Sequence, residues 1–312
     1  MYLIFLLLVA NAVVLSGASE DWCYTGCESS PSHWHDHFPR CGGEEQSPIN
    51  IDTKTVNSLK ALNSFQMTGF EKKDVMKRLS NNGHSVTCEL ESGAVNISGG
   101  GLHGKYMAAQ FHFHWGRTDL MHFPGSEHSI DGHRLPIEMH IVSLKEGLNM
   151  TEVKNDSSGL AVLGFFIDEG NGTADQIQAW DTFTKLITNV SSTGDNVDMS
   201  LSLSINDLLG SLNMKDYYRY NGSLTTPTCD EVVVWTVFPK PIRISKDLIQ
   251  RFAGETSIQD NYRPQQTLHD RKVYASANMD VTNPESGHHW CYAGCGEFNN
   301  YVVMTVEDHC CF

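Results

Sequence analysis

The sequence predicts a mostly β protein of the α+β class: a single domain around a large, mainly antiparallel twisted sheet with a few short surface helices. Alternating segments punctuated by glycine dominate from about residue 46 to 274, and such alternation is typical of strands. The apolar runs LAVLGFFI (160–167) and VVVWTVF (232–238) have the length of buried strands. The 312 residues, 40% of them hydrophobic and 19% charged, are enough to build a sizeable core.

Two segments have helical spacing. DQIQAWDTFTKLI (175–187) places Ile177, Trp180, Phe183 and Ile187 along one face. SKDLIQRFAG (245–254) starts with Ser245 as its N-cap and is expected to end at Gly254. We expect both apolar faces to pack against the core.

The two ends of the chain indicate export. An apolar run from Tyr2 to Leu15 precedes Ser16 and Ala18, which stand at positions −3 and −1 of a cleavage site after Ala18. This run is short for a membrane anchor, and the C-terminus carries charged residues that a lipid-anchor signal lacks. We therefore expect a secreted, extracellular protein with a signal peptide (1–18), one domain (19–278), a Cys-rich C-terminal extension (279–312) and no membrane anchor.

Six Asn-x-Ser/Thr sequons suit an exported glycoprotein: Asn96, Asn149, Asn155, Asn171, Asn189 and Asn221.

The net charge is −15 with histidines neutral. A surface of this sign repels phosphate backbones and anionic lipid head groups. Nucleic acid is therefore excluded as a partner.

The segment FHFHWG (111–116) alternates aromatic and imidazole side chains. On a strand, Phe111, Phe113 and Trp115 share one face, and His112 and His114 share the other. The pair alone also fits a half-buried strand with its histidines in water. A metal site needs further ligands.

The segment PIEMHIV (136–142) offers the third ligand. Alternation places Glu138 and His140 on one face, and catalytic zinc commonly has three protein ligands and one open position. If this strand lies beside the first, His140 completes a three-histidine set. Glu138 could then accept a hydrogen bond from His140, and Gln110 one from His112.

Other histidines are weaker candidates. His33, His35 and His37 also alternate, but polar residues surround them and we expect them on the surface. His128, beside Glu127, fits a hydrogen-bonded structural histidine better than a ligand.

Eight motifs occur in one order along the chain: QSPINI (46–51), NNGHSV (81–86), QFHFHWG (110–116), GSEH (125–128), IEMHIV (137–142), GLAVLGFF (159–166), GSLTTPTC (222–229) and RPQQ (263–266). Together they resemble the signature blocks of the α-class carbonic anhydrases. The resemblance runs from about Trp22 to Tyr274 and is to secreted, extracellular members, here with a Cys-rich extension. It implies reversible hydration of carbon dioxide to bicarbonate and a proton, by attack of zinc-bound hydroxide.

The resemblance also implies roles for individual residues. Zn2+ would be held by His112, His114 and His140. Thr225 would orient the hydroxide by donating its own proton to Glu127, and His84 would shuttle protons to solvent. Tyr24 and Asn82 would order water near His84. The substrate cavity would be lined by Val142, Val162, Leu224, Thr225, Thr226, Val233 and Trp235.

The strand pattern conflicts with the expected role of His84. Strict alternation in HSVTCEL (84–90) would place His84 on the same face as Cys88 and Leu90, which are expected in the core. An irregularity at the start of the strand would remove the conflict.

Nine cysteines leave at least one unpaired within a chain. The resemblance implies a disulfide between Cys41 and Cys229, and Cys88 is expected to be a buried free thiol. WCYTGC (22–27) returns as WCYAGC (290–295) near the other end. We expect the tail to bridge to the N-terminal motif, or between subunits to give a disulfide-linked homo-oligomer; a metal-binding tail is the alternative. The cysteines concerned are Cys23, Cys27, Cys291, Cys295, Cys310 and Cys311.

Other functions have weaker support. A catalytically weak carbonic-anhydrase-like matrix or binding protein would typically lack a zinc histidine, and all three are present. The sequence contains neither H-E-x-x-H, expected of a zinc peptidase, nor G-x-S-x-G, expected of a serine hydrolase.

Overall fold

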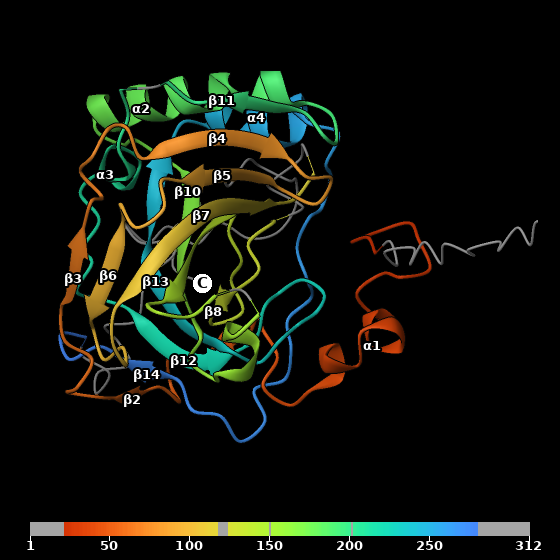
Figure 1. The fold of residues 1–312 in the computed structure, drawn as a ribbon, viewed down its shortest axis with the longest axis vertical. Helices are drawn as coiled ribbons and strands as arrows, with labels where there is room; N and C mark the ends of the chain where they lie inside the picture. The colour runs from red at the N-terminus through yellow and green to blue at the C-terminus, as the bar shows by residue number, and fades with distance from the viewer. Residues whose placement is uncertain (1–21, 118–123, 150, 201, 280–312) are drawn as a thin grey trace, which may run out of the picture.

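A computed structural model describes residues 22–117, 124–149, 151–200 and 202–279. The predicted leader, and all of the predicted extension after residue 279, lie outside these ranges. Figure 1 shows a large curved sheet with α2 and α4 side by side along one side of it. The strands are β1 (Asn50–Ile51), β2 (Asn57–Ser58), β3 (Phe65–Thr68), β4 (Met76–Asn81), β5 (Val86–Leu90), β6 (Asn96–Gly99), β7 (Tyr106–Trp115), β8 (Ser129–Ile130), β9 (Ile137–Lys145), β10 (Leu160–Glu169), β11 (Asn196–Asp198), β12 (Tyr218–Gly222), β13 (Val233–Ile244) and β14 (Tyr274–Ala275). The helices are α1 (Trp34–His37), α2 (Ala174–Lys185), α3 (Ile205–Leu209) and α4 (Lys246–Glu255), with 3-10 turns η1 (Pro39–Gly42), η2 (Val153–Asn155) and η3 (Ile187–Val190).

The main sheet has twelve strands, in the order β11–β4–β5–β7–β9–β10–β13–β12–β14–β2, with β6 paired to β7 and β3 to β6. Neighbouring strands are antiparallel except for β10 with β13 and β14 with β2. β1 and β8 form a separate parallel pair. The predicted mostly β fold with a large, mainly antiparallel sheet is therefore confirmed.

Strands β7 and β9 have one apolar and one polar face. Phe111, Phe113 and Trp115 of β7 are fully buried in the core beneath the helices, together with apolar side chains of β9. The ring of Phe113 lies 4.9–6.0 Å from the rings of Phe111, Trp180, Phe183 and Phe252. Burying each such side chain contributes about 1.5–3 kcal/mol, so a one-residue slip of β7 would expose the whole set. The core thereby fixes which face of β7 carries the histidines.

The two predicted helices are present with small shifts. The α2 helix starts one residue earlier than predicted, where the Thr173 hydroxyl accepts a hydrogen bond from the backbone N–H of Gln176, and it is followed by η3. The α4 helix continues to Glu255, so the prediction that Gly254 ends it is wrong by one residue. Ser245 stands at the N-cap of α4 but makes no side-chain cap bond.

Two short helices were not predicted. The α1 helix is a single turn, too short to show a period in the sequence. The α3 helix begins at a capping box, in which Ser204 and Asp207 each accept a hydrogen bond from the other's backbone N–H.

The described residues contain two disulfides. Cys41 pairs with Cys229, while Cys23 pairs with Cys27. The expectation that Cys23 and Cys27 bridge to the tail is therefore wrong: the four-residue spacing lets them close a local loop. Cys88 is free and buried, as expected, and the tail cysteines lie outside the described residues.

Among the described residues, no helix combines the length and apolar character needed to cross a bilayer.

Candidate metal centre and active site

Three histidines meet where β7 and β9 pair. His112 lies directly opposite His140 in the register of the two strands, and His114 is two residues further along β7. The three ring centroids are 4.6–5.3 Å apart, and each ring offers a nitrogen within 4.8 Å of those of the other two. The structure thus brings together the three predicted ligands.

Each ring uses one nitrogen in a hydrogen bond. His112 Nδ1 donates to Gln110 Oε1 (2.9 Å), and His114 Nδ1 donates to the Asn261 carbonyl (2.7 Å). His140 Nε2 donates to Glu138 Oε1 (2.7 Å). The other nitrogens, Nε2 of His112 and His114 and Nδ1 of His140, therefore carry the lone pairs. His114 Nε2 is buried and has no hydrogen-bond partner, as expected of an atom that faces a metal.

The rings are held in the neutral form that binds metal. Burial lowers the pKa of His112 well below its usual value, that of His114 to about 4, and that of His140 as well. A metal ligand must be deprotonated, and three imidazoles suit Zn2+. These residues fit a zinc ion with one coordination position left open.

Glu138 fixes the orientation of two rings. It is fully buried and accepts hydrogen bonds from His140, from the His128 ring (2.7 Å) and from the His128 backbone N–H (2.8 Å). Burial alone would raise its pKa, but His128 and His140 outweigh this and hold the pKa well below its usual value. Gly164 on β10 leaves room for it, since a β-carbon there would lie 3.1 Å from Glu138 Oε1. Glu138, His128 and His140 could also surround a metal, but both rings already donate to the carboxylate.

His128 links this carboxylate to a more distant loop. Its second nitrogen, Nε2, lies 2.7 Å from the Tyr220 hydroxyl, which donates to Ser47 Oγ (2.8 Å). Ser47 Oγ in turn accepts the backbone N–H of Ser223. His128 is therefore a buried, hydrogen-bonded histidine, as expected.

Glu127 and Thr225 lie beside the histidines. Glu127 is fully buried, with Oε1 3.4 Å from His114 Nδ1 and Oε2 3.9 Å from His140 Nδ1. Oε1 accepts the backbone N–H of Arg263 (2.8 Å), while Oε2 has no hydrogen-bond partner of regular geometry. Burial raises the pKa of Glu127 to about 7, although His140, Arg263 and the Thr225 hydroxyl each lower it. A buried carboxylate and a hydroxyl thus face each other next to the rings.

The loop that carries Thr225 and Thr226 is braced at several points. Ser47 and Ser223 exchange hydrogen bonds between the hydroxyl of each and the backbone N–H of the other. Trp235 Nε1 donates to the Ser223 carbonyl (3.0 Å), and Cys229 is tied to Cys41. These contacts limit the movement of Thr225, which is 6% exposed.

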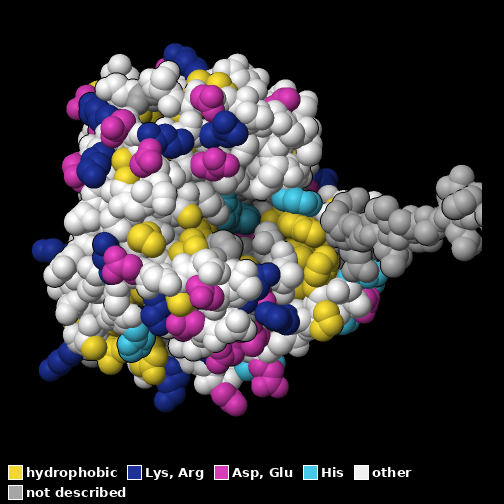
Figure 2. Space-filling view, viewed as in Figure 1, with side chains coloured by type: hydrophobic (Ala, Val, Ile, Leu, Met, Phe, Trp, Pro, Cys, Tyr) yellow, Lys and Arg dark blue, Asp and Glu magenta, His cyan; other side chains and the backbone are white. Residues whose placement is uncertain are grey.

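An apolar wall adjoins the rings. Val162, Val233 and Trp235 are buried in one cluster, with Val142 and Leu224 half-buried against it. The ring of Trp235 lies 4.8 Å from that of His140. In Figure 2, histidine side chains lie in a hollow at the centre of the face, with hydrophobic side chains beside it. All five predicted apolar residues thus gather in one place.

His84 lies in a turn before β5, which begins only at Val86. The Asn82 side chain accepts the backbone N–H groups of His84 and Ser85, and Gly83 has a φ of +87°. This turn is the irregularity that the alternation of residues 84–90 required. Asn82 is exposed and its carbonyl oxygen is used within the turn.

The His84 ring stacks on Trp22, with centroids 3.7 Å apart and planes inclined by 10°. Trp22 immediately precedes the loop closed by Cys23 and Cys27. Tyr24 belongs to the same loop, and its hydroxyl is buried. Burial and the nearby Glu127 raise the pKa of Tyr24 well above its usual value, although Arg263 lowers it.

His33, His35 and His37 are exposed, at and within α1. In a helix, residues two apart do not face one another. In the described part of the chain they belong to no group arranged to hold a metal.

The sequence reasoning missed three supporting residues: Asn261, Arg263 and Tyr220. The backbone carbonyl of Asn261 accepts a hydrogen bond from His114, and its side-chain amide donates to the carbonyls of His84 and Phe113. The motif RPQQ begins at Arg263 and was the one available signal for this segment. Neither Asn261 nor Tyr220 has a sequence pattern that reveals a contact so distant along the chain.

Comparisons with known proteins agree with this geometry. The profile of the family described as eukaryotic-type carbonic anhydrase matches residues 29–277. The chain is 38% identical to carbonic anhydrase 4 of Oryctolagus cuniculus over 292 residues, covering 88% of this chain and 91% of that protein. It is 32% identical to carbonic anhydrase 6 of Homo sapiens (89% and 91% covered) and 33% identical to carbonic anhydrase 15 of Mus musculus (90% of each covered).

Replacing Glu138 by Gln should weaken zinc binding about 10- to 100-fold, because the amide no longer holds the His140 ring with a charged acceptor. Competition with a chromophoric chelator measures the affinity, and near-ultraviolet circular dichroism verifies the fold. Glu89→Gln, at an exposed position on β5, is the matched control and should bind zinc like the unaltered chain. Equal zinc affinity in folded Glu138→Gln would contradict the role of this carboxylate.

Proposed function

The chain belongs to the eukaryotic-type carbonic anhydrase family, and we propose that it is a secreted zinc enzyme for the reversible hydration of carbon dioxide. The observation that carries the proposal is the convergence of three neutral histidines, His114 and His140 buried and His112 half-buried, beside Glu127, Thr225 and an apolar wall. Zn2+, when bound, lowers the pKa of a coordinated water to about 7, as is established for this family, and so supplies hydroxide at neutral pH.

Thr225 and Glu127 orient the nucleophile. Glu127 Oε2 is buried and lacks a regular hydrogen-bond partner, so it is the acceptor available to the Thr225 hydroxyl. With its own proton donated to Glu127, Thr225 Oγ1 can only accept a hydrogen bond from the nucleophile. Thr225 thereby leaves a lone pair of the nucleophile directed toward the substrate carbon. Thr226 adds a second hydroxyl at the cavity.

The apolar wall receives the substrate. Carbon dioxide is small and offers little to hydrogen-bond, so hydrophobic contact next to the reacting oxygen is the main way to hold it. Trp235 borders both His140 and the loop of Thr225, and Val142, Val162, Leu224 and Val233 pack around it. The wall thus places the carbon near the nucleophile.

His84 carries the released proton to solvent. Imidazole is the side chain best suited to proton exchange near neutral pH. His84 is half-buried, in a turn whose carbonyl is held by Asn261, the residue that also accepts from His114. This connection ties the shuttle turn to the metal-binding strand.

Secretion is supported by three features. The leader precedes a candidate cleavage site after Ala18, and both disulfides suit an oxidising compartment. Five of the six sequon asparagines are exposed, while Asn96 is half-buried and donates to the Gly93 carbonyl.

Export by a eukaryotic cell should yield a chain that begins at Ser19 and loses mass on treatment with an N-glycosidase. N-terminal sequencing and mass spectrometry of the medium measure both. A chain retained in the cytosol with Met1 intact and no glycan would contradict secretion.

Stopped-flow assays of the zinc-loaded protein should show rapid hydration of carbon dioxide, blocked by an aromatic sulfonamide. His112→Ala removes one of three ligands and should lower kcat/KM more than about 100-fold. His35→Ala, on the exposed α1 helix, should leave the rate unchanged. An inactive zinc-loaded protein would instead favour the matrix or binding protein.

His84→Ala should lower kcat up to about 100-fold in weak buffer while leaving kcat/KM nearly unchanged, because only proton export is affected. Added imidazole should restore much of the rate. Loss of kcat without rescue would mean that His84 acts structurally.

A further inference from the structure

A cavity of about 590 Å3 lies along β12, away from the histidine cluster. Strand β14 pairs only with Tyr218 and Arg219, so the next two residues of β12, Tyr220 and Asn221, line the cavity at an edge that β14 leaves open. The volume is that of a site for a small organic molecule.

Arg219 is the unusual residue in its lining. It is only 6% exposed, and its guanidinium donates to a single acceptor, Thr236 Oγ1, through Nε (3.2 Å) and Nη2 (2.9 Å). Its other close neighbours are the rings of Tyr217 and Phe65, 5.5 and 5.8 Å from the guanidinium carbon. Within the described ranges, no carboxylate forms an ion pair with it.

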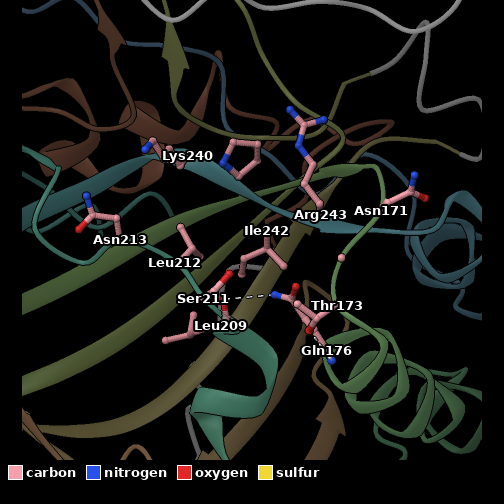
Figure 3. Close-up of a pocket in the computed structure, with 12 residues that line it drawn as sticks. Asn171, Thr173, Gln176, Leu209, Ser211, Leu212, Asn213, Lys240, Ile242 and Arg243 are labelled. Carbon is pink, nitrogen blue, oxygen red and sulfur yellow. Dashed lines mark hydrogen bonds between the residues drawn. The ribbon is translucent and has the colours of Figure 1, made fainter.

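Two other arginines have more acceptors than Arg219 or a carboxylate partner. Arg263, 2% exposed, donates to three oxygens, of Gln46, Ser47 and Cys41, and lies in the field of Glu127. Arg243 lines a second cavity of about 260 Å3, shown in Figure 3, and is paired with Asp168 at 2.6 Å. Burying a charge without an ion-pair partner costs free energy. The absence of a carboxylate beside Arg219 among the described residues therefore requires an explanation.

The free end of Arg219 is directed to the cavity. Nη1 makes no hydrogen bond to any described residue and lies beside Gly101, which also lines the cavity. A β-carbon at Gly101 would lie 3.6 Å from Nη1, and the φ of +74° there disfavours any other residue. Glycine is required at this position by its φ and by Leu62, whose Cδ2 would lie 2.6 Å from a β-carbon.

The rim adds further cationic groups. Arg271 and Lys272 line the cavity together with His103. The acidic residues in its lining are Glu45 and Asp270. Arg271 is committed to the carbonyls of Gln46, Thr267, Leu268 and Asn221. In a chain of net charge −15, this cavity has a local excess of positive charge.

We propose that this cavity is a second binding site, which takes a small organic carboxylate and pairs it with Arg219. A guanidinium fork matches the planar geometry of a carboxylate. Leu59, 37% exposed, together with Leu62, Val234 and Tyr274, offers apolar surface to the rest of the ligand. The site is separate from the proposed catalytic centre, so its occupancy does not depend on the proposed function.

Calorimetric titration with benzoate tests the site in the zinc-loaded full chain, after an aromatic sulfonamide has saturated the metal centre. One equivalent should bind. Arg219→Met keeps the side-chain length without the charge and should weaken binding about 10- to 100-fold. Arg243→Met, the same change in the cavity of Figure 3, should bind benzoate like the unaltered chain. Acetate, which lacks the ring, should bind at least about 3-fold more weakly than benzoate.

Crystals of the unaltered chain soaked in 4-bromobenzoate provide a measurement that does not depend on a variant that folds. The bromine anomalous peak should lie in the cavity, with the carboxylate within hydrogen-bond distance of Arg219 Nη1. Unchanged benzoate affinity in folded Arg219→Met, no binding at millimolar concentration, or bromine peaks only elsewhere would overturn the proposal.

Discussion

The register between β7 and β9 determines where the three histidines of the candidate metal site meet. It places His112 opposite His140 because the alternate residues of both strands are fixed in an aromatic and aliphatic core. Phe111, Phe113 and Trp115 cannot leave that core without exposing three large rings, so the histidines of β7 have only one face available. The hydrophobic effect on one side of the sheet thus builds the polar site on the other.

Electrostatics in this site follows from burial. Removing the three rings from water favours their neutral form, and each ring is oriented by an acceptor on its second nitrogen. The acceptors differ in kind: an amide for His112, a backbone carbonyl for His114 and a carboxylate for His140. Only Glu138 adds a full negative charge, and it shares that charge with His128. The rings therefore keep their lone pairs free for a metal, and the next carboxylate is that of Glu127, 3.9 Å from His140 Nδ1.

Local pattern predicted much of this arrangement, and long-range packing supplied the remainder. Period-two alternation is visible in seven residues, so the faces of β7 and β9 and the contacts of Gln110 and Glu138 were predictable. The turn at His84, closed by the Asn82 side chain and held by Asn261, was left open, and the end of α4 was misplaced by one residue. Asn261 and Tyr220 reach the site from about 150 and 90 residues away in sequence (|i−j| = 147 and 92), where no local signal exists. The Cys23–Cys27 pair shows the reverse error: a local closure was overlooked in favour of a distant partner.

Zinc-edge X-ray absorption of the full chain, combined with anomalous diffraction at the same edge, shows whether a metal binds between β7 and β9 and which atoms surround it. We expect one zinc per chain, between the side chains of His112, His114 and His140, with three nitrogen neighbours at about 2.0–2.1 Å and a fourth, light neighbour from solvent. Sulfur neighbours at about 2.3 Å would place the metal on cysteines, and a peak between His128 and Glu138 would place it on the wrong side of His140. Either result would rule out the proposed three-histidine zinc site.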